Sequence, residues 1–313
     1  MFPPEDGVDV TDVLEYTTPI GVRQLEQRTH VSGGFGRPSV DQMCLRGGNV
    51  SAVSKGQEMM KITTDLSGKT ALITGASSGI GAGVARALAA NGARVFLNYP
   101  DENQERHVSA ILESIKAAGG EGEAVQADVS SEEQVLAMFA QIQAQGWGLH
   151  ILVNNAGVAH SSPVELMEVA DFDRLMGIHV RGTFLCTRSA LPIFYEQNWG
   201  RVINTASQLA YIGAPGFSHY TAAKGAILSF TRSLALEIGD RSITANCVAP
   251  GATMTPILEG VPEEILEAIR GNIPAGRLAE VEDIVGSYVF LASEAAAHYR
   301  GQCLSPNGGD AFL

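Results

Sequence analysis

The stretch that decides the fold is KTALITGASSGIGAGVARAL, residues 69–88. It opens with the apolar run TALIT, which predicts a buried strand, and continues as a segment of helical period. Gly75, Gly79 and Gly81 occupy the turn between the two. Glycines permit the sharp turn, let the backbone approach a pyrophosphate and let the helix pack closely on the sheet. Because the first N–H groups of a helix attract anions, this stretch predicts a dinucleotide-binding turn.

The rest of the chain repeats the alternation of strand and helix. Short apolar runs predict strands at 70–74, 94–98, 123–127, 149–153, 201–205 and 242–248, and near 302–305. Segments with a period of 3.6 predict helices at 79–91, 102–118, 131–144, 171–197, 220–238 and 281–293. Parallel strands joined by crossover helices form an α/β fold with a doubly wound parallel sheet, Rossmann-like, in a single domain over 66–313. Such sheets bind ligands beyond the carboxyl ends of their strands.

Residues 1–65 read as an N-terminal extension of low intrinsic order. Scattered Gly, Pro and polar residues give no sustained period of 2 or 3.6. The first residues, MFPPEDGVDV, are acidic and lack the apolar core of a secretory signal or the Arg-rich composition of a transit peptide. Met59 or Met60 could be the true start of the protein, and the sequence leaves that open.

Composition limits the partners of this chain. The 313 residues carry a net charge of −13, which disfavours nucleic acid and anionic membrane, because phosphate contacts need clustered Lys and Arg. No apolar stretch approaches the ~20 residues of a membrane span. The four cysteines have no metal-ligand spacing, so we expect free thiols, no metal site and a cytoplasmic protein.

The end of the second predicted strand bears on the choice of cofactor. An acidic residue there bonds the ribose 2′-hydroxyl of NAD and repels the 2′-phosphate of NADP. The expected position falls at Tyr99, which is not acidic, and Asp101 follows only after Pro100. No Arg or Lys stands there either. The sequence mildly favours NADP and leaves NAD open.

Tyr220 and Lys224 lie four residues apart in SHYTAAKGAI, on one face of a predicted helix. An unperturbed phenol has a pKa of about 10, and a nearby cation lowers that pKa. The pair is therefore expected to move a proton to or from a substrate oxygen near pH 7. Ser207 follows the strand 201–205, so its hydroxyl is placed where it could hold that oxygen.

Taken together, these motifs resemble those of one family, the short-chain dehydrogenase/reductases, and its single-domain, 3-oxoacyl reductase-like branch. Among members of the family, sugar or polyol dehydrogenase-like proteins are similar as well. The resemblance covers about residues 66–313 and rests on TGASSGIG (74–81), NNAG (154–157), Ser207, the pair Tyr220 and Lys224, and APG with Thr255 (249–255). It implies an NAD(P)-dependent oxidoreductase that moves a hydride between nicotinamide and a secondary alcohol or ketone. The cofactor supplies the hydride chemistry and the protein orients it.

The resemblance also implies a role for each matching residue. Tyr220 would be the acid/base, Ser207 would polarise the carbonyl or hydroxyl, and Lys224 would bond the nicotinamide ribose and lower the pKa of Tyr220. Asp128 would bond adenine, and Thr255 would bond the carboxamide end. The full set expected to bind the cofactor is Gly75, Ser78, Gly79, Ile80, Gly81, Tyr99, Asp128, Val129, Asn155, Ala156, Gly157, Tyr220, Lys224, Pro250, Gly251, Thr253 and Thr255.

One residue departs from the family's pattern. The family usually has an asparagine in the long helix after NNAG, where it holds a water that links the lysine to solvent. In this chain the segment reads GIHVRGTF, so His179 takes that place. We expect His179 to be part of the catalytic group, with a proton relay that is slower, more pH-sensitive or differently routed. The alternative is a tolerated variant in a buried helix.

Further interpretations stay open at this point. The fold could serve a non-catalytic dinucleotide-binding regulator or scaffold, or an isomerase or dehydratase. The apolar residues Met254, Ile257, Leu258 and Val261 predict a lid over the substrate, or one face of a packed helix. The expected partners are a small-molecule alcohol or ketone and further copies of the chain. The resemblance suggests a homotetramer or dimer built on the helices 171–197 and 220–238.

Overall fold

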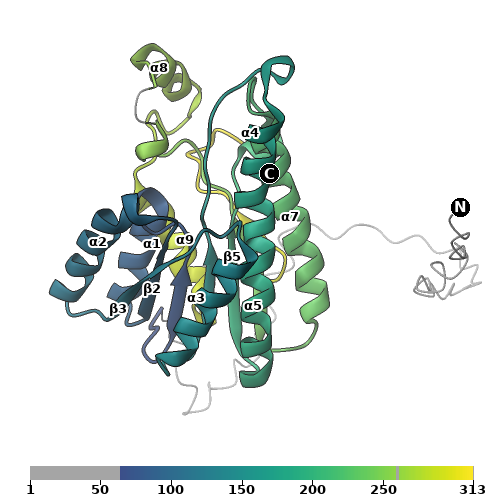
Figure 1. Ribbon diagram of the computed structural model, residues 1–313. Helices are drawn as coiled ribbons and strands as arrows, with labels where there is room; N and C mark the ends of the chain where they lie inside the picture. Colours follow the sequence, from purple (N-terminus) through teal and green to yellow (C-terminus); the bar gives the residue numbers. More distant parts are fainter. Residues whose placement is uncertain (1–63, 259–260, 313) are drawn as a thin grey trace, which may run out of the picture. The chain divides into compact units, whose positions relative to one another are not determined.

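The computed structural model describes residues 64–258 and 261–312. Within them, seven parallel strands form one sheet in the order β3-β2-β1-β4-β5-β6-β7 (Figure 1). They are β1 (Thr70–Ile73), β2 (Arg94–Tyr99), β3 (Gly122–Gln126), β4 (Ile151–Asn154), β5 (Gly200–Thr205), β6 (Ile243–Val248) and β7 (Cys303–Leu304). This confirms the predicted doubly wound fold. The strand order reverses between β1 and β4, which creates a crevice at their carboxyl ends.

Helices cover both faces of the sheet. One face carries α1 (Gly79–Ala90), α2 (Glu105–Ala117) and α9 (Val281–Ala292), and the other carries α3 (Glu132–Ala144), α5 (Gly182–Gln197) and α7 (Ser218–Ile238) (Figure 1). Shorter elements are α4 (Val169–Met176), α6 (Leu209–Ile212), α8 (Glu263–Asn272), η3 (Glu102–Gln104), η4 (Val164–Leu166), η6 (Pro256–Leu258) and η7 (Glu294–Ala296). Every residue of β1, β4, β5 and β6 is buried, as expected for parallel strands covered by helices on both faces.

The predicted helix 171–197 is interrupted in the structure. It is divided into α4, a π-helical turn η5 (Gly177–Arg181) and α5. A π-helical turn inserts an extra residue into the helix and often marks a functional site. Here it carries His179. Sequence periodicity did not reveal this turn, because the apolar pattern continues across it.

The predicted extension, residues 1–65, lies outside the described residues except for Thr64 and Asp65, so its structure stays a prediction. In the described part of the chain, no helix is both long and apolar enough to cross a membrane.

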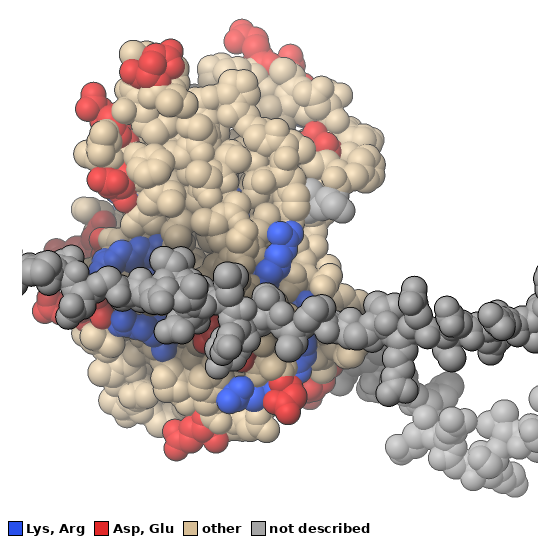
Figure 2. Space-filling model, turned by 90° about the vertical axis from the view of Figure 1, so that its right-hand side faces the viewer, with Lys and Arg blue, Asp and Glu red and all other residues tan. Residues whose placement is uncertain are grey.

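Charges of both signs share the side of the molecule on which α7 lies. Figure 2 views that side, and its upper part is mostly uncharged, with Asp and Glu toward the edge. Lys and Arg are confined to the lower part, where acidic residues stand beside them (Figure 2).

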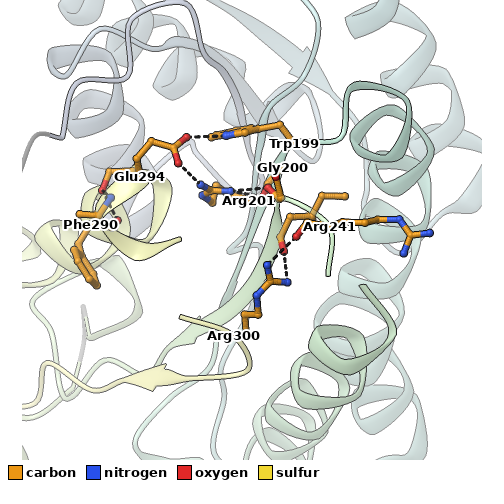
Figure 3. Close-up of polar contacts among 11 residues, drawn as sticks. Trp199, Gly200, Arg201, Arg241, Phe290, Glu294 and Arg300 are labelled. Atoms are coloured by element: carbon orange, nitrogen blue, oxygen red, sulfur yellow. Dashed lines mark hydrogen bonds and ion pairs between the residues drawn. The ribbon is translucent and has the colours of Figure 1, made fainter. Parts of the chain in front are cut away.

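A polar cluster fixes the end of the sheet opposite the crevice (Figure 3). Arg201, near the start of β5, is 1% exposed and bonds Glu294 at 3.1 Å. The indole of Trp199 donates to the same carboxylate at 2.7 Å and lies 4.2 Å from the Arg201 guanidinium. Arg300 donates to the backbone carbonyls of 239, 241 and 243, which ties the chain after η7 to the start of β6. These contacts compensate the cost of burying a guanidinium.

Candidate active site

A cavity of about 1210 Å³ lies at the carboxyl ends of the strands. Seventeen of the nineteen residues predicted for the site line it: Gly75, Ser78, Gly79, Ile80, Asp128, Val129, Asn155, Ala156, Gly157, His179, Ser207, Tyr220, Lys224, Pro250, Gly251, Thr253 and Thr255. The structure therefore brings together residues from the first strand–helix turn and from the ends of β3, β4, β5 and β6. The two that do not line the cavity are Gly81 and Tyr99.

The glycine turn has the shape of an anion cradle. Gly75 and Gly79 adopt positive φ angles of 63° and 53°, which other residues rarely adopt. A Cβ on Gly75 would lie 2.7 Å from the Cα of Ala156, so a side chain there would collide with backbone. Ser78 caps α1 without a side-chain hydrogen bond, and the first turn contains no acidic residue. No capping side chain therefore bonds the N–H groups at the start of α1, and these groups lie at the cavity. Free N–H groups at a helix start suit the binding of a pyrophosphate.

Gly81 has a structural role beside this cradle. A Cβ there would lie 2.3 Å from the carbonyl oxygen of Gly75 and 2.5 Å from Nδ2 of Asn155. Gly81 therefore permits the close packing of α1, the role expected for the third glycine of the turn, and its contribution to cofactor binding stays a prediction. Asn155 fixes the same turn, since its Nδ2 donates to the carbonyls of Thr74 and Gly75 at 3.0 and 3.2 Å.

The placement of Tyr99 also differs from the prediction. Its side chain is 8% exposed and packs in the core with α1 and α2. The reason is the alternation of a strand, because neighbouring side chains point to opposite faces. Asn98 lines the cavity instead, but its Nδ2 donates to Ala127 O at 2.9 Å and its Oδ1 accepts from Gly75 N. Asp101 also lines the cavity, so an acid does stand near the end of β2.

Ser207, Tyr220 and Lys224 meet in the cavity beside β5. The Ser207 hydroxyl lies near the phenol of Tyr220 and tends to lower its pKa, and its Oγ accepts from Leu209 N at 3.2 Å. Lys224 is 3% exposed, and its Nζ donates to the carbonyl of Thr205 at 2.7 Å. The same Nζ lies 5.6 Å from the centroid of the Tyr220 ring. The i,i+4 spacing on α7 thus places the phenol and the amine on one face, as predicted.

The pKa values of Tyr220 and Lys224 differ from the expectation that Lys224 lowers the pKa of Tyr220. Burial raises the pKa of Tyr220, and the hydrogen bond from Ser207 lowers it only in part. Burial also lowers the pKa of Lys224 to about 7. The predicted lowering of the Tyr220 pKa by Lys224 is not seen, because a deeply buried amine loses much of its own charge near neutral pH. The phenol is therefore protonated and able to donate.

His179 is neutral in this setting. Burial, followed by the nearby charge of Lys224, lowers the pKa of its imidazole to about 3. Its Nε2 lies 2.7 Å from Val158 O and 3.0 Å from Val158 N. The ring stands edge-on to Tyr220 at a centroid distance of 5.5 Å. A Cβ on Gly157 would lie 2.4 Å from the ring, so the glycine makes room for the histidine.

Several cavity residues were missed by sequence reasoning. His160 lines the cavity, and its Nε2 lies 3.3 Å from Nε2 of His219. Gln208 donates through its Nε2 to Asp310 at 2.5 Å, and both line the cavity. Pairs separated by 59 and 102 residues leave no signal in local spacing. The one signal in the sequence is that Gln208 directly follows Ser207, which could have suggested that Gln208 lies in the site.

Three of the four residues predicted to form a lid line the cavity. Ile257, Leu258 and Val261 line the cavity, whereas Met254 does not. Leu258 and Val261 also pack against the small core of α8, which includes Leu266. Residues 259–260 lie outside the described residues, so closure of a lid stays a prediction.

The chain belongs to the short-chain dehydrogenase/reductase family. A family described as Enoyl-(Acyl carrier protein) reductase matches residues 75–310, which is most of the chain. Together with the fold and the site above, this confirms the resemblance found in the sequence. The protein is an NAD(P)-dependent oxidoreductase that transfers a hydride between nicotinamide and an alcohol or carbonyl substrate.

Individual relatives cover the same region. The 3-oxoacyl-(acyl-carrier-protein) reductase FabG of Staphylococcus aureus is 35% identical over 241 residues, 77% of this chain and 97% of the relative. A solved structure provisionally named gluconate dehydrogenase, from Agrobacterium tumefaciens, has 32% identity and a TM-score of 0.77, and covers 81% of this chain and 100% of its own. A gluconate 5-dehydrogenase from Burkholderia cenocepacia was solved with NADP and tartrate. It has 29% identity and a TM-score of 0.74, and the match covers 79% of this chain and 96% of that protein.

Proposed function

We propose that this protein interconverts a secondary alcohol and a ketone with Ser207, Tyr220 and Lys224 as its catalytic group. The observation that carries the proposal is that these three side chains line the same cavity as the glycine turn. A bound nicotinamide cofactor supplies or accepts the hydride. A regulator without catalysis would have no need of a buried amine, a phenol and a hydroxyl at that place.

In the direction of reduction, Tyr220 donates its proton to the carbonyl oxygen of the substrate. Its raised pKa keeps the phenol protonated at neutral pH, which suits this role. Ser207 lines the same cavity as the phenol and would hold the same substrate oxygen. Lys224, with a pKa of about 7, can return a proton to the tyrosine. His179 would position Tyr220 through their edge-on contact rather than carry charge, because its imidazole is neutral.

The cradle at α1 and the residues Asp128, Asn155 and Thr255 would hold the dinucleotide. We propose NADP as the preferred form, with NAD as the alternative. Arg106 supports NADP, because it lines a groove that shares Ser78 and the glycine turn with the main cavity. A guanidinium there offers a partner for a 2′-phosphate. Asp101 opposes this preference, since a carboxylate repels a phosphate.

Fluorescence titration with NADPH and NADH in parallel tests the choice of cofactor, and needs no substrate. Arg106→Ala is expected to weaken NADPH binding about tenfold or more and to leave NADH binding within twofold, because only NADPH carries the 2′-phosphate. Arg270→Ala, which removes an exposed arginine of α8 from outside that groove, serves as the control. Equal losses for both cofactors, or none, would contradict the NADP preference.

The substrate is expected to be a small or medium hydroxy or keto compound. The relatives named above include 3-oxoacyl reductases and gluconate dehydrogenases, and both acid and sugar derivatives fit this class. The test is a panel of ketones and alcohols with NADPH, NADH and their oxidised forms. Steady cofactor oxidation with at least one ketone supports the proposal. An isomerisation or dehydration without net cofactor turnover would favour the other reaction classes.

We also propose that the chain forms a homotetramer or dimer in the cytoplasm. Exposed apolar side chains on the two long helices support assembly, among them Phe184 on α5 at 45% and Leu236 on α7 at 84% exposure. Exposed apolar patches are characteristic of interfaces. The free thiols of Cys186, Cys247 and Cys303 support a reducing compartment. Light scattering of wild type and of Leu236→Glu tests the assembly.

A further inference from the structure

Two cysteines face each other across neighbouring strands at the edge of the sheet. Cys247 of β6 is paired in register with Cys303 of β7. Both thiols are free, and both belong to the same apolar cluster beneath α7. In-register residues on neighbouring strands lie about 4.8 Å apart, which is inside the range of roughly 4.4–6.8 Å between the Cα atoms of a disulfide.

The two thiols differ in exposure and acidity. Cys303 is half-buried, and the neighbouring thiol of Cys247 and the hydroxyl of Tyr211 lower its pKa. Cys247 is 1% exposed, and its pKa is raised, first by Cys303 and then by burial. Its Sγ donates to Oγ1 of Thr231 at 3.1 Å. Cys303 is therefore suited to attack an oxidant, because the thiolate is the nucleophile, and Cys247 is placed to resolve the product.

We propose that Cys247 and Cys303 form a peroxide-sensitive modification site, where hydrogen peroxide produces a disulfide that lowers the activity of the enzyme. The sulfur of Cys303 attacks one oxygen of the peroxide, the O–O bond breaks, and a sulfenic acid and one water result. The sulfur of Cys247 then attacks that of Cys303, the S–O bond breaks, and the departing hydroxide takes the Cys247 proton as a second water. Two thiols lose two electrons in total, and one peroxide is reduced to two waters.

The effect on activity follows from what Cys247 touches. Its partner Thr231 lies on α7, seven residues after Lys224. Thr231 also accepts from Asn204 at 2.8 Å and donates to Ile227 O at 2.7 Å, so it ties α7 to β5. A disulfide removes the bond from Cys247 to Thr231, beneath the helix that carries the catalytic pair.

The experiment treats the full-length reduced protein with hydrogen peroxide, then blocks the remaining thiols and maps the peptides by mass. We expect a peptide pair that joins Cys247 to Cys303, two hydrogens lighter than the reduced pair, and its loss with dithiothreitol. The variant Cys303→Ser is expected to form no such bond, and Cys247→Ser to stop at a sulfenic acid that dimedone traps. Cys186→Ser is the matched control, since Cys186 is buried on α5 and burial raises its pKa to about 12.

The same samples are assayed for reductase activity with the best substrate from the panel. Activity is expected to fall at least threefold in wild type and Cys186→Ser, to return with dithiothreitol, and to be spared in Cys303→Ser. Absence of the linked peptides, or equal inactivation of Cys303→Ser, would overturn the proposal. A disulfide with unchanged activity would overturn the link to catalysis. The activity readout rests on the proposed function, whereas the mass readout does not, so the two can fail separately.

Discussion

Replacing Lys224 by methionine is expected to abolish turnover and yet to stabilise the fold near neutral pH. Burial lowers the pKa of Lys224 from 10.5 to about 7. A folded-state pKa below the unfolded one means that the unfolded chain binds more protons, so this lysine costs stability. At about 1.36 kcal/mol per unit of pKa, the cost at pH 7 is roughly 4 kcal/mol.

Methionine removes this cost but leaves the carbonyl of Thr205 without the donor that it has at 2.7 Å. An unsatisfied buried acceptor costs about 1–3 kcal/mol. The net gain at pH 7 is therefore about 1–3 kcal/mol. The penalty of the wild-type lysine is full below the folded pKa and disappears as the pH rises toward the unfolded value. At pH 9 it has fallen to roughly 2 kcal/mol, so the advantage of the variant shrinks by about 2 kcal/mol.

Urea unfolding followed by tryptophan fluorescence measures this at pH 7 and pH 9, for wild type, Lys224→Met and Lys116→Met. Lys116 is an exposed lysine of α2 and serves as the control. The difference between wild type and Lys224→Met should change by about 2 kcal/mol between the two pH values, and that for Lys116→Met should stay constant. A difference for Lys224→Met that does not vary with pH would refute the reasoning.

Three further predictions concern other parts of the molecule. Gly81→Ala should weaken dinucleotide binding at least tenfold, because its Cβ would lie 2.3 Å from a carbonyl oxygen of the glycine turn, whereas Gly225→Ala, with open space around it, should bind normally in the same titration. His179→Asn should keep every inflection of the pH–rate profile between pH 5 and 9, because the pKa of the histidine is about 3; loss of an inflection near neutrality would show that it titrates. Glu294→Ala should lower the free energy of unfolding by about 1–3 kcal/mol, since it leaves the buried Arg201 without its carboxylate.

Much of the fold could be predicted because it depends on local patterns. β1 and β4 are short, mostly apolar runs, and the turn at Gly75 and Gly79 has glycines where positive φ is required. The pairing of Tyr220 with Lys224 follows from the helical repeat alone. Each of these features depends on residues that are close together in the sequence.

The features that sequence did not reveal depend on distant contacts. The face on which Tyr99 points could not be known without the register of β2. The surroundings of His179 are set by Val158, 21 residues earlier, and by Gly157. The altered pKa of Lys224 is a property of burial, which no spacing expresses. The sequence interpretation took Lys224 as a fixed cation for that reason.

The central claim is that the phenol of Tyr220 transfers the proton to and from the substrate oxygen. The most direct measurement compares wild type with Tyr220→Phe, with cofactor affinity by fluorescence and turnover with the best ketone. We expect turnover to fall by about 10²–10⁴ while the cofactor dissociation constant stays within threefold. A phenylalanine variant that keeps near wild-type turnover would contradict the account.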